Sequence, residues 1–243
     1  MAMRGIVNLI KNKFISFLKK QNQLTLKGHS FIHPSVKMHS AFIDGEVSIQ
    51  EGCNIIYGVN ISAGKPVTIG RYSSLNGPNT DVTCSLNAVT IGAFCSIARN
   101  VSIQEYNHRF DGMSSYLMHK NVFKEPVVKD LYSRGPVEIG NDVWIGSHCV
   151  VLGGTKIGDG AVVGANSVVS GEIPPYAVVA GSPAKIIKYR FSEDIVAVLS
   201  ALKWWDWPIE KIIANRFLFE GKLTKEKLLE LDFGGAPASV TKP

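Results

Sequence analysis

The sequence is poor in charged residues and in cysteine, and each shortage excludes a class of protein. Charged residues make up 19% of the 243 residues and hydrophobic residues 45%, a balance that a disordered chain does not have. Four cysteines without close pairs do not form the disulfide framework of a secreted domain. No apolar run reaches the ~18 residues of a membrane-spanning helix, and no secretory signal is visible. We therefore expect one large or two small folded domains in the cytoplasm.

Motifs for covalent catalysis and for metal binding are also missing. No G-x-S-x-G elbow or P-loop occurs, and the six histidines are not grouped with the spacing of metal ligands. Cys84 has no base beside it, and the other three cysteines follow a pattern, described below, that places them in the core. The sequence therefore predicts neither a covalent nucleophile nor a metal site.

Positive charge is concentrated near the N-terminus. Residues 1–43 carry seven basic side chains and no acidic one, whereas the other 200 residues carry 19 basic and 20 acidic side chains. The body of the protein is therefore not expected to bind nucleic acid. Within residues 4–20, apolar side chains recur at helical spacing with lysines between them, which predicts a basic amphipathic helix. This helix either packs on the protein or contacts anionic lipid at the inner face of the membrane.

Aliphatic residues recur at every sixth position over most of the chain. The longest series is Ile139, Ile145, Val151, Ile157, Val163 and Val169, and the same register recurs between residues 43 and 103. A period of six fits neither an α-helix nor an alternating strand. It fits a short strand followed by a turn, three of which make one coil of a three-sided prism.

A second inward position lies four residues after each aliphatic one and is mostly small. Cys53, Cys95 and Cys149 occupy this position, so we expect them to fill the core as inert thiols. Turn residues at the corners include Asn141, Gly160 and Asn166, which tolerate conformations that other residues avoid.

Two stretches leave the six-residue period. Residues 76–90 lose the register, so we expect an irregular coil there. Residues 104–136 leave it entirely, and their aromatic side chains predict a packed external loop rather than a disordered one.

The repeats stop near residue 181, which divides the chain into three parts. Residues 1–28 form the N-terminal helical part, residues 29–181 the prism with its loop, and residues 182–243 a helical extension and tail. In the extension, Ser192 before two acidic residues predicts a helix start.

An ordered series of motifs resembles one branch of a known family. NHRFDG at 107–112, GNDVWIG at 140–146, IPPYAVVAGSPAK at 173–185 and KWWDW at 203–207 resemble the streptogramin- and chloramphenicol-type xenobiotic acetyltransferases of the hexapeptide-repeat family. The resemblance covers about residues 50–210. It implies an all-β fold, a left-handed parallel β-helix, with acetyl-CoA as co-substrate. It also implies a homotrimer with active sites between neighbouring prisms.

The same resemblance assigns roles to single residues. His108 matches the general base of the family, a role for which a neutral imidazole is suited because its pKa lies near working pH. His119, eleven residues further along, is the alternative base, and His148 is expected on the surface. The positions that match coenzyme A contacts are Trp144, Ser147, Ala165, Ser170, Lys185 and Lys188. The pair Ser170-Gly171 departs from the family pattern, in which a Thr-Lys-like pair is more common.

Three functions follow from these observations. The leading hypothesis is acetyl transfer to a hydroxyl or amine of a sugar used in bacterial surface polysaccharide biosynthesis. The first alternative is a streptogramin or chloramphenicol O-acetyltransferase, with an apolar acceptor pocket formed by the loop. The second alternative is a trimeric scaffold without catalytic activity.

Overall fold

The protein comprises two compact units, which are described separately below. The computed structural model describes residues 25–231, and the first unit ends at Arg190 while the second begins at Phe191. The predicted helix of residues 4–20 and the end of the tail lie outside the described residues. Thr25–Lys27 already forms a strand, β1, which pairs with β4 of the prism.

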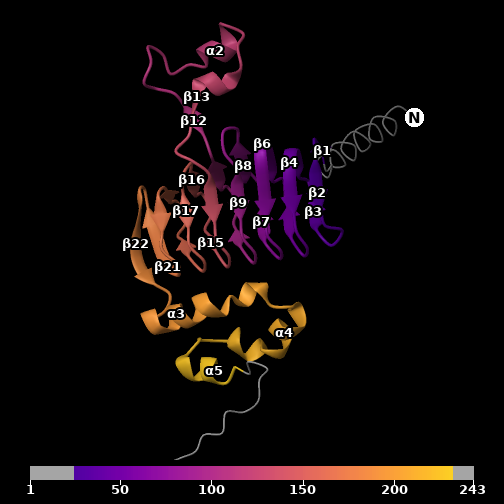
Figure 1. The fold of residues 1–243 in the computed structure, drawn as a ribbon, viewed down its shortest axis with the longest axis vertical. Helices are drawn as coiled ribbons and strands as arrows, with labels where there is room; N and C mark the ends of the chain where they lie inside the picture. The colour runs from indigo at the N-terminus through magenta and orange to yellow at the C-terminus, as the bar shows by residue number, and fades with distance from the viewer. Residues whose placement is uncertain (1–24, 232–243) are drawn as a thin grey trace, which may run out of the picture. The chain divides into compact units, whose positions relative to one another are not determined.

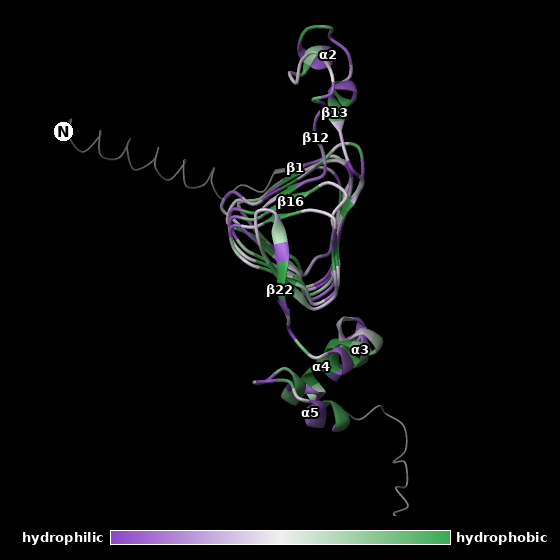
Figure 2. Cartoon of the chain, turned by 90° about the vertical axis from the view of Figure 1, so that its left-hand side faces the viewer, coloured by the Kyte–Doolittle hydropathy of each residue, from purple (hydrophilic) through white to green (hydrophobic). Residues whose placement is uncertain are grey.

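The first unit is a left-handed parallel β-helix whose coils have three sides (Figures 1 and 2). Face 1 is an eight-stranded sheet. Its strands are β3 (Lys37–His39), β5 (Asn54–Ile56), β7 (Ser74–Asn76), β10 (Ser96–Ile97), β15 (Trp144–Ile145), β18 (Val162–Val163), β21 (Ala177–Gly181) and β22 (Ala184–Tyr189). All neighbours pair in parallel except β21 and β22, which form an antiparallel hairpin at the end of the stack.

The other two faces form one continuous sheet, because β4 (Phe42–Ile49) and β6 (Asn60–Ile69) bend around the corner between them. Face 2 contains β1, β8 (Asp81–Cys84), β11 (Ser102–Gln104), β16 (Val150–Leu152) and β19 (Val168–Val169). Face 3 contains β2 (Ser30–Ile32), β9 (Val89–Ile91), β14 (Val137–Ile139), β17 (Lys156–Ile157) and β20 (Glu172–Ile173). Each coil therefore runs through faces 1, 2 and 3 in that order.

The core confirms the six-residue pattern. Every aliphatic residue of the series from Ile139 to Val169 is buried, as is the residue four positions after each. Because the inward side chains of successive coils stack, the prism is filled by columns of aliphatic side chains, and each coil buries apolar surface against its neighbours.

Corner residues adopt the left-handed backbone that the turns require. Gly160 and Asn166 have φ values of 69° and 59°, as the sequence predicts. At the third predicted position the left-handed residue is Asp142 (φ 54°) rather than its neighbour Asn141. Asn141 instead links three levels of the stack, since its side chain donates to Asp159 and accepts from the backbone N–H of Ala93. The six-residue pattern predicted the position of this corner, but not which of the two adjacent polar residues adopts the left-handed conformation.

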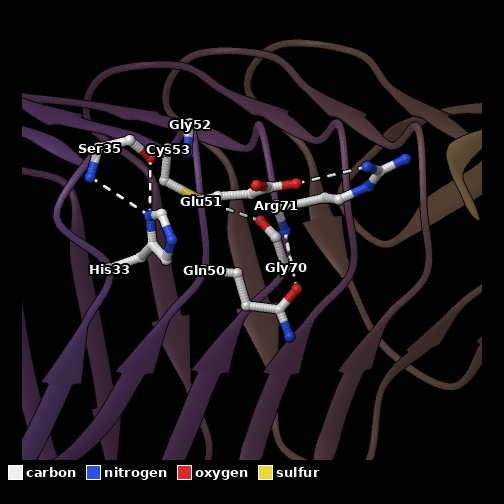
Figure 3. A network of polar contacts seen from close by, with 8 residues as sticks. All are labelled: His33, Ser35, Gln50, Glu51, Gly52, Cys53, Gly70 and Arg71. Atoms are coloured by element: carbon white, nitrogen blue, oxygen red, sulfur yellow. Dashed lines mark hydrogen bonds and ion pairs between the residues drawn. The ribbon is translucent and has the colours of Figure 1, made fainter. Parts of the chain in front are cut away.

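Polar side chains tie the first coils together (Figure 3). The backbone N–H groups of Gly52 and Ser35 donate to Ser35 Oγ and His33 Nδ1, respectively. His33 Nδ1 and Ser35 Oγ lie 2.8 Å apart, in a serine–histidine contact. One level further along, Arg71 makes an ion pair with Glu51. This serine–histidine contact thus belongs to a chain of links between coils.

The predicted loop departs from face 2 and returns to face 3, at the corner between them (Figure 2). It contains β12 (Asn107–His108), α2 (Met118–Asn121), η1 (Val127–Asp130) and β13 (Leu131–Tyr132), and β12 pairs with β13 in antiparallel fashion. The loop is ordered, as predicted, but the packing predicted from its aromatic side chains is wrong for most of them. Phe110, Tyr116, Phe123 and Tyr132 are exposed, Phe110 to 77%, whereas Leu131 of β13 is buried.

The second unit is helical. It contains α3 (Glu193–Leu202), η2 (Trp204–Asp206), α4 (Ile209–Ala214), η3 (Arg216–Leu218) and α5 (Lys225–Leu229). Ser192 is the N-cap residue of α3, as predicted, and the Trp204 ring packs edge-on against Phe219. Within residues 25–231, none of the helices combines the length and the apolar character needed to cross a bilayer.

Candidate active site

His108 lies at the base of the loop, where the antiparallel pairing of β12 with β13 fixes its backbone. His108 is paired with Leu131, and the N–H of Arg109 donates to the carbonyl of Asp130. The imidazole Nδ1 lies 2.9 Å from the carbonyl oxygen of Ser115. Because a carbonyl oxygen can only accept a hydrogen bond, Nδ1 must carry the hydrogen. The lone pair of the neutral ring is therefore on Nε2, which has no hydrogen-bond partner in the described part of the chain.

Glu105 anchors the start of this loop, and the sequence analysis did not identify it. Its carboxylate is buried and accepts hydrogen bonds from the N–H groups of Ser85 and Leu86 and from the side chain of Asn87. The hydroxyl of Ser133, at the end of the loop, donates to the Glu105 carbonyl at 2.7 Å. One glutamate thus joins both ends of the loop to the irregular coil at residues 85–87.

The hydrogen bonds determine the ionisation of Glu105. Burial alone would raise its pKa, but the nearby Ser133 hydroxyl and the hydrogen bonds that the carboxylate accepts from Ser85, Asn87 and Leu86 outweigh burial and hold the pKa below its usual value. A signal for this residue exists in the sequence, because Val101, Ile103 and Glu105 alternate along a strand. An acidic residue at an inward position predicts a satisfied buried carboxylate.

Asp130 holds the helix α2 of the loop in place, and the sequence analysis did not identify this residue either. Its two carboxylate oxygens accept from the backbone N–H groups of His119 and Lys120, at 2.9 and 2.8 Å. Burial would raise the pKa of Asp130, but these hydrogen bonds and the nearby imidazoles lower it overall. Since the Asp130 carbonyl also holds Arg109, the helix α2 is tied directly to the strand that carries His108.

A cavity of about 330 Å³ lies within the loop. Its lining includes the apolar side chains Met113, Tyr116, Met118 and Phe123, with His119 and Lys129 among the polar ones. Ser114 and Tyr116 also line it, and they flank Ser115, whose carbonyl holds the His108 ring. The cavity therefore adjoins the segment that orients the candidate base.

His119 and His148 have separate environments. His119 Nδ1 contacts the carboxylate of Glu125, on the wall of the loop cavity. His148 is exposed at a corner of the prism, as expected, and its Nε2 lies 3.3 Å from the Asn100 side-chain nitrogen.

The six residues predicted to contact coenzyme A divide into two groups. On face 1, the register places Trp144 beside Val162, Val162 beside Val178, and Val178 beside Lys188, and Lys185 lies next to Ala180. At the corner between faces 1 and 2, Ser147 and Ala165 occupy successive levels, since the N–H of Asn166 donates to the Ser147 carbonyl. These five residues thus share one side of the prism.

Ser170 lies apart from this group. It follows β19, at the corner between faces 2 and 3 from which the loop departs. The corner with Ser147 and Ala165 is separated from the corner with Ser170 and the loop by the width of face 2. Five residues at about 3.3 Å per residue make this width roughly 16 Å. Within one chain, His108 and the group of five therefore lie on different corners.

Cys53, Cys95 and Cys149 are buried, as predicted, and Cys84 is buried as well. Cys53, Cys95 and Cys149 donate through Sγ to the carbonyls of Gly70, Gly140 and Gly164 on the next coil. Burial raises the pKa of each thiol, that of Cys95 to about 12, which disfavours the nucleophilic thiolate. In the described part of the chain, no three His, Cys, Asp or Glu side chains group as metal ligands.

Comparisons with known proteins agree with this architecture. Residues 136–171 match the family described as bacterial transferase hexapeptide (six repeats). A chloramphenicol acetyltransferase of Morganella morganii is 38% identical over 169 residues, which cover 60% of this chain and 78% of the relative. A putative lipopolysaccharide biosynthesis O-acetyl transferase of Escherichia coli K12 is 40% identical over 152 residues, which cover 60% and 74%.

A solved structure supports the fold. A single-residue mutant of the N-acyltransferase AntD from Bacillus cereus, in complex with dTDP and coenzyme A, has a TM-score of 0.54 and 22% identity. The similarity covers 76% of this chain and 94% of that protein. The solved structure shares the fold, and the two relatives are each covered to more than two thirds of their length. The chain therefore belongs to the hexapeptide-repeat transferase family, in the branch of the chloramphenicol-type acetyltransferases, and is an acetyltransferase.

Proposed function

We propose that this chain transfers an acetyl group from acetyl-CoA directly to a hydroxyl of a small acceptor, with His108 as general base. The observation that carries the proposal is the hydrogen bond between His108 Nδ1 and the Ser115 carbonyl. It fixes the tautomer whose Nε2 can accept a proton, and it ties the ring to Ser115, whose neighbours Ser114 and Tyr116 line the loop cavity. A scaffold without catalytic activity, one of the hypotheses from the sequence, does not agree with the similarity to acetyltransferases along most of their length.

The proton transfer explains why a base is required. An alcohol is a weak nucleophile toward a thioester because its proton must leave as the carbon–oxygen bond forms. His108 Nε2 accepts this proton while the acceptor oxygen attacks the thioester carbonyl carbon. The carbon–sulfur bond then breaks, and the proton returns from the imidazolium to the departing CoA sulfur. No acyl-enzyme is formed, which agrees with the buried state of the four cysteines.

The donor binds along the group of five residues on face 1 and its corner. Ser147 and Ala165 contact the pantetheine arm at successive levels, and Trp144 lies beside it. Lys185 and Lys188 are exposed on β22, where their ammonium groups can contact the phosphates of coenzyme A. Ser170 lies at the corner between faces 2 and 3, away from the group of five. It therefore contacts the coenzyme A that is bound by a neighbouring prism.

The active site is made by two copies of the chain. His108 extends from one corner of a prism and the donor residues lie along another, with the roughly 16 Å width of face 2 between the two corners. A neighbouring copy that presents its donor corner to the loop brings both groups together. Repeating this contact around a threefold axis gives three equivalent sites and closes the assembly as a homotrimer.

A xenobiotic acceptor of the chloramphenicol type fits the loop cavity best. Apolar side chains make up much of its wall, and they suit an acceptor that buries an apolar ring beside the reacting hydroxyl. The relatives at 37–39% identity include several chloramphenicol acetyltransferases, which supports the same substrate class.

A sugar hydroxyl in surface polysaccharide biosynthesis is the second candidate. It is favoured by the 40% identity to the lipopolysaccharide O-acetyl transferase of Escherichia coli. A galactoside O-acetyltransferase of the same strain is 35% identical over 160 residues. A contact of residues 4–20 with the inner face of the membrane would suit this candidate.

An acceptor panel tests the proposal. Release of CoA thiol from acetyl-CoA is followed with a disulfide reagent, in the presence of chloramphenicol, a streptogramin A, galactosides and amino sugars. The four buried cysteines keep the protein's own background low. We expect turnover of chloramphenicol by the wild type and only a small residual rate in His108→Ala. Turnover with the sugars alone would establish the second candidate, and turnover with none would refute acetyl transfer to these classes.

A further inference from the structure

A second histidine of the loop is held in a defined geometry that the proposed role of His108 does not use. His119 Nδ1 lies 2.5 Å from Glu125 Oε2, and the other carboxylate oxygen lies 3.2 Å from Lys129 Nζ. The hydrogen bond from His119, followed by that from Lys129, holds the pKa of Glu125 below its usual value. Because an ionised carboxylate only accepts hydrogen bonds, Nδ1 of His119 carries the hydrogen.

Further contacts fix the orientation of this ring. The Phe123 ring packs edge-on against it, with centroids 5.5 Å apart. The backbone N–H of His119 donates to Asp130, and its carbonyl accepts from the N–H of Glu125. The imidazole is therefore positioned before any ligand binds, so little conformational entropy is lost when a partner reaches it.

A ligand in the loop cavity would contact the imidazole of His119. Its side chain is 38% exposed and lines the cavity of about 330 Å³, together with Met113, Tyr116, Met118 and Phe123. Across residues 25–231, no hydrogen-bond partner is present for His119 Nε2. A ligand that enters the cavity removes water from this nitrogen, and a buried acceptor without a partner is costly. A bound ligand must therefore supply a hydrogen-bond donor at this point.

We propose that Nε2 of His119 accepts a hydrogen bond from a second hydroxyl group of the acceptor. The enzyme thereby selects acceptors in which a hydrogen-bond donor lies beside an apolar ring, in addition to the hydroxyl that is acetylated. This inference rests on the proposed function, since it defines the acceptor class of the same site. The cavity volume lies near the lower end of the ~300–1,000 Å³ range of ligand pockets, which suits one ring with its substituents rather than a polymer.

Matched acceptors and variants test this role. Chloramphenicol carries two hydroxyls and a nitrophenyl ring, and its 1-deoxy analogue lacks the hydroxyl that is not acetylated. Nitrophenyl galactoside and its monodeoxy analogues form the corresponding sugar set. Each acceptor is assayed with wild type, His119→Phe and His119→Gln. His29→Phe, at an exposed position between β1 and β2 and outside the loop, is the control for a histidine-to-phenylalanine change.

The expected result is a change confined to one acceptor of a pair. His119→Phe keeps the ring volume but removes the acceptor nitrogen, so it raises KM for the hydroxyl-bearing compound about tenfold, with kcat nearly unchanged. The deoxy analogue shows no such change. In His119→Gln the side-chain amide oxygen can still accept a hydrogen bond, so that variant falls between wild type and His119→Phe. The control behaves as wild type.

Other outcomes overturn the inference in distinguishable ways. Equal KM values for both members of a pair in the wild type would refute it while leaving the proposed function intact. A fall in kcat for both members in His119→Phe would show that His119 acts as a base or as a structural support. Failure of the wild type to acetylate any acceptor would refute the proposed function, and this inference with it.

Discussion

The coils of the prism and the loop at residues 104–136 use the same kinds of side chain in different ways. In the coils, apolar side chains point inward at fixed intervals and are buried. In the loop, Phe110, Tyr116 and Phe123 are exposed, while charged side chains form its internal contacts. The coils therefore provide stability and position, and the loop provides groups that can meet a ligand. The comparison predicts that substitutions in the coils change stability, whereas substitutions in the loop change catalysis.

The strongest test of the loop is the loss of its candidate base. His108→Ala removes the group that accepts the hydroxyl proton, so we expect kcat to fall by roughly 10²–10⁴-fold. The free energy of unfolding and the affinity for coenzyme A should be nearly unchanged, because the His108 side chain is exposed and lies away from the donor corner. Urea denaturation and calorimetric titration with coenzyme A check these two quantities, and steady-state kinetics measures kcat. Near-normal turnover would remove His108 from this role.

The matching test of the coils uses one core position and one exposed loop position. Ile145→Ala leaves a cavity among stacked aliphatic side chains and should lower the free energy of unfolding by about 2–5 kcal/mol. Phe110→Ala, at an exposed loop position, should change it by less than about 0.5 kcal/mol. Urea denaturation of the two variants and of the wild type measures both changes in unfolding free energy. Equal losses at the two positions would contradict the proposed division between coils and loop.

Glu105 joins the two regions, so its substitution should affect both. Glu105→Gln removes the charge that holds the irregular coil and should cost about 1–3 kcal/mol of stability at pH 7. The pKa of Glu105 is lower in the folded state than in the unfolded chain, so its stabilising effect is complete above the unfolded pKa. The effect is lost as the pH falls through the lowered pKa.

Denaturation of wild type and Glu105→Gln across pH 3–7 measures this linkage. The difference in unfolding free energy between them should shrink as the pH falls below about 4.5, the ordinary value for a glutamate. A difference that stays constant with pH would show that the charge of Glu105 does not stabilise the fold. A loss of stability without any loss of turnover would show that the loop is oriented independently of this anchor.

The smallest expected effect concerns residues 4–20. If this segment forms the predicted basic amphipathic helix on a lipid surface, deletion of residues 1–22 should reduce sedimentation with anionic liposomes and leave turnover unchanged. Neutral liposomes are the control, because they lack the charge that attracts the lysines. Identical sedimentation of both proteins with anionic vesicles would instead favour packing of this segment on the protein.

Much of the prism could be predicted from the sequence because its physical cause is periodic. A residue that stacks on its equivalent in the next coil must recur at a fixed interval, so the positions of Ile145 and Cys149 follow from the pattern alone. The limits of the loop can be predicted for the same reason, because the six-residue spacing of aliphatic side chains stops at residue 104 and resumes after residue 136.

The contacts within the loop could not be predicted in this way. The hydrogen bonds of Asp130 and the pair of His119 with Glu125 depend on a single folded geometry that does not repeat. The resemblance to a family indicated His108 as the base but not its tautomer, which depends on the position of the Ser115 carbonyl. Non-periodic contacts of this kind require the structure.

Subunit mixing tests most directly the central claim that the loop of one copy acts on the donor corner of another. His108→Ala chains are mixed in equal amounts with Ser147→Trp chains, in which the donor corner is blocked, by joint unfolding and refolding. Neither variant should be active alone. Since sites at random interfaces combine an intact loop with an intact corner in about a quarter of cases, we predict recovery of about a quarter of wild-type activity. No recovery in a correctly assembled mixture would contradict a site shared between copies.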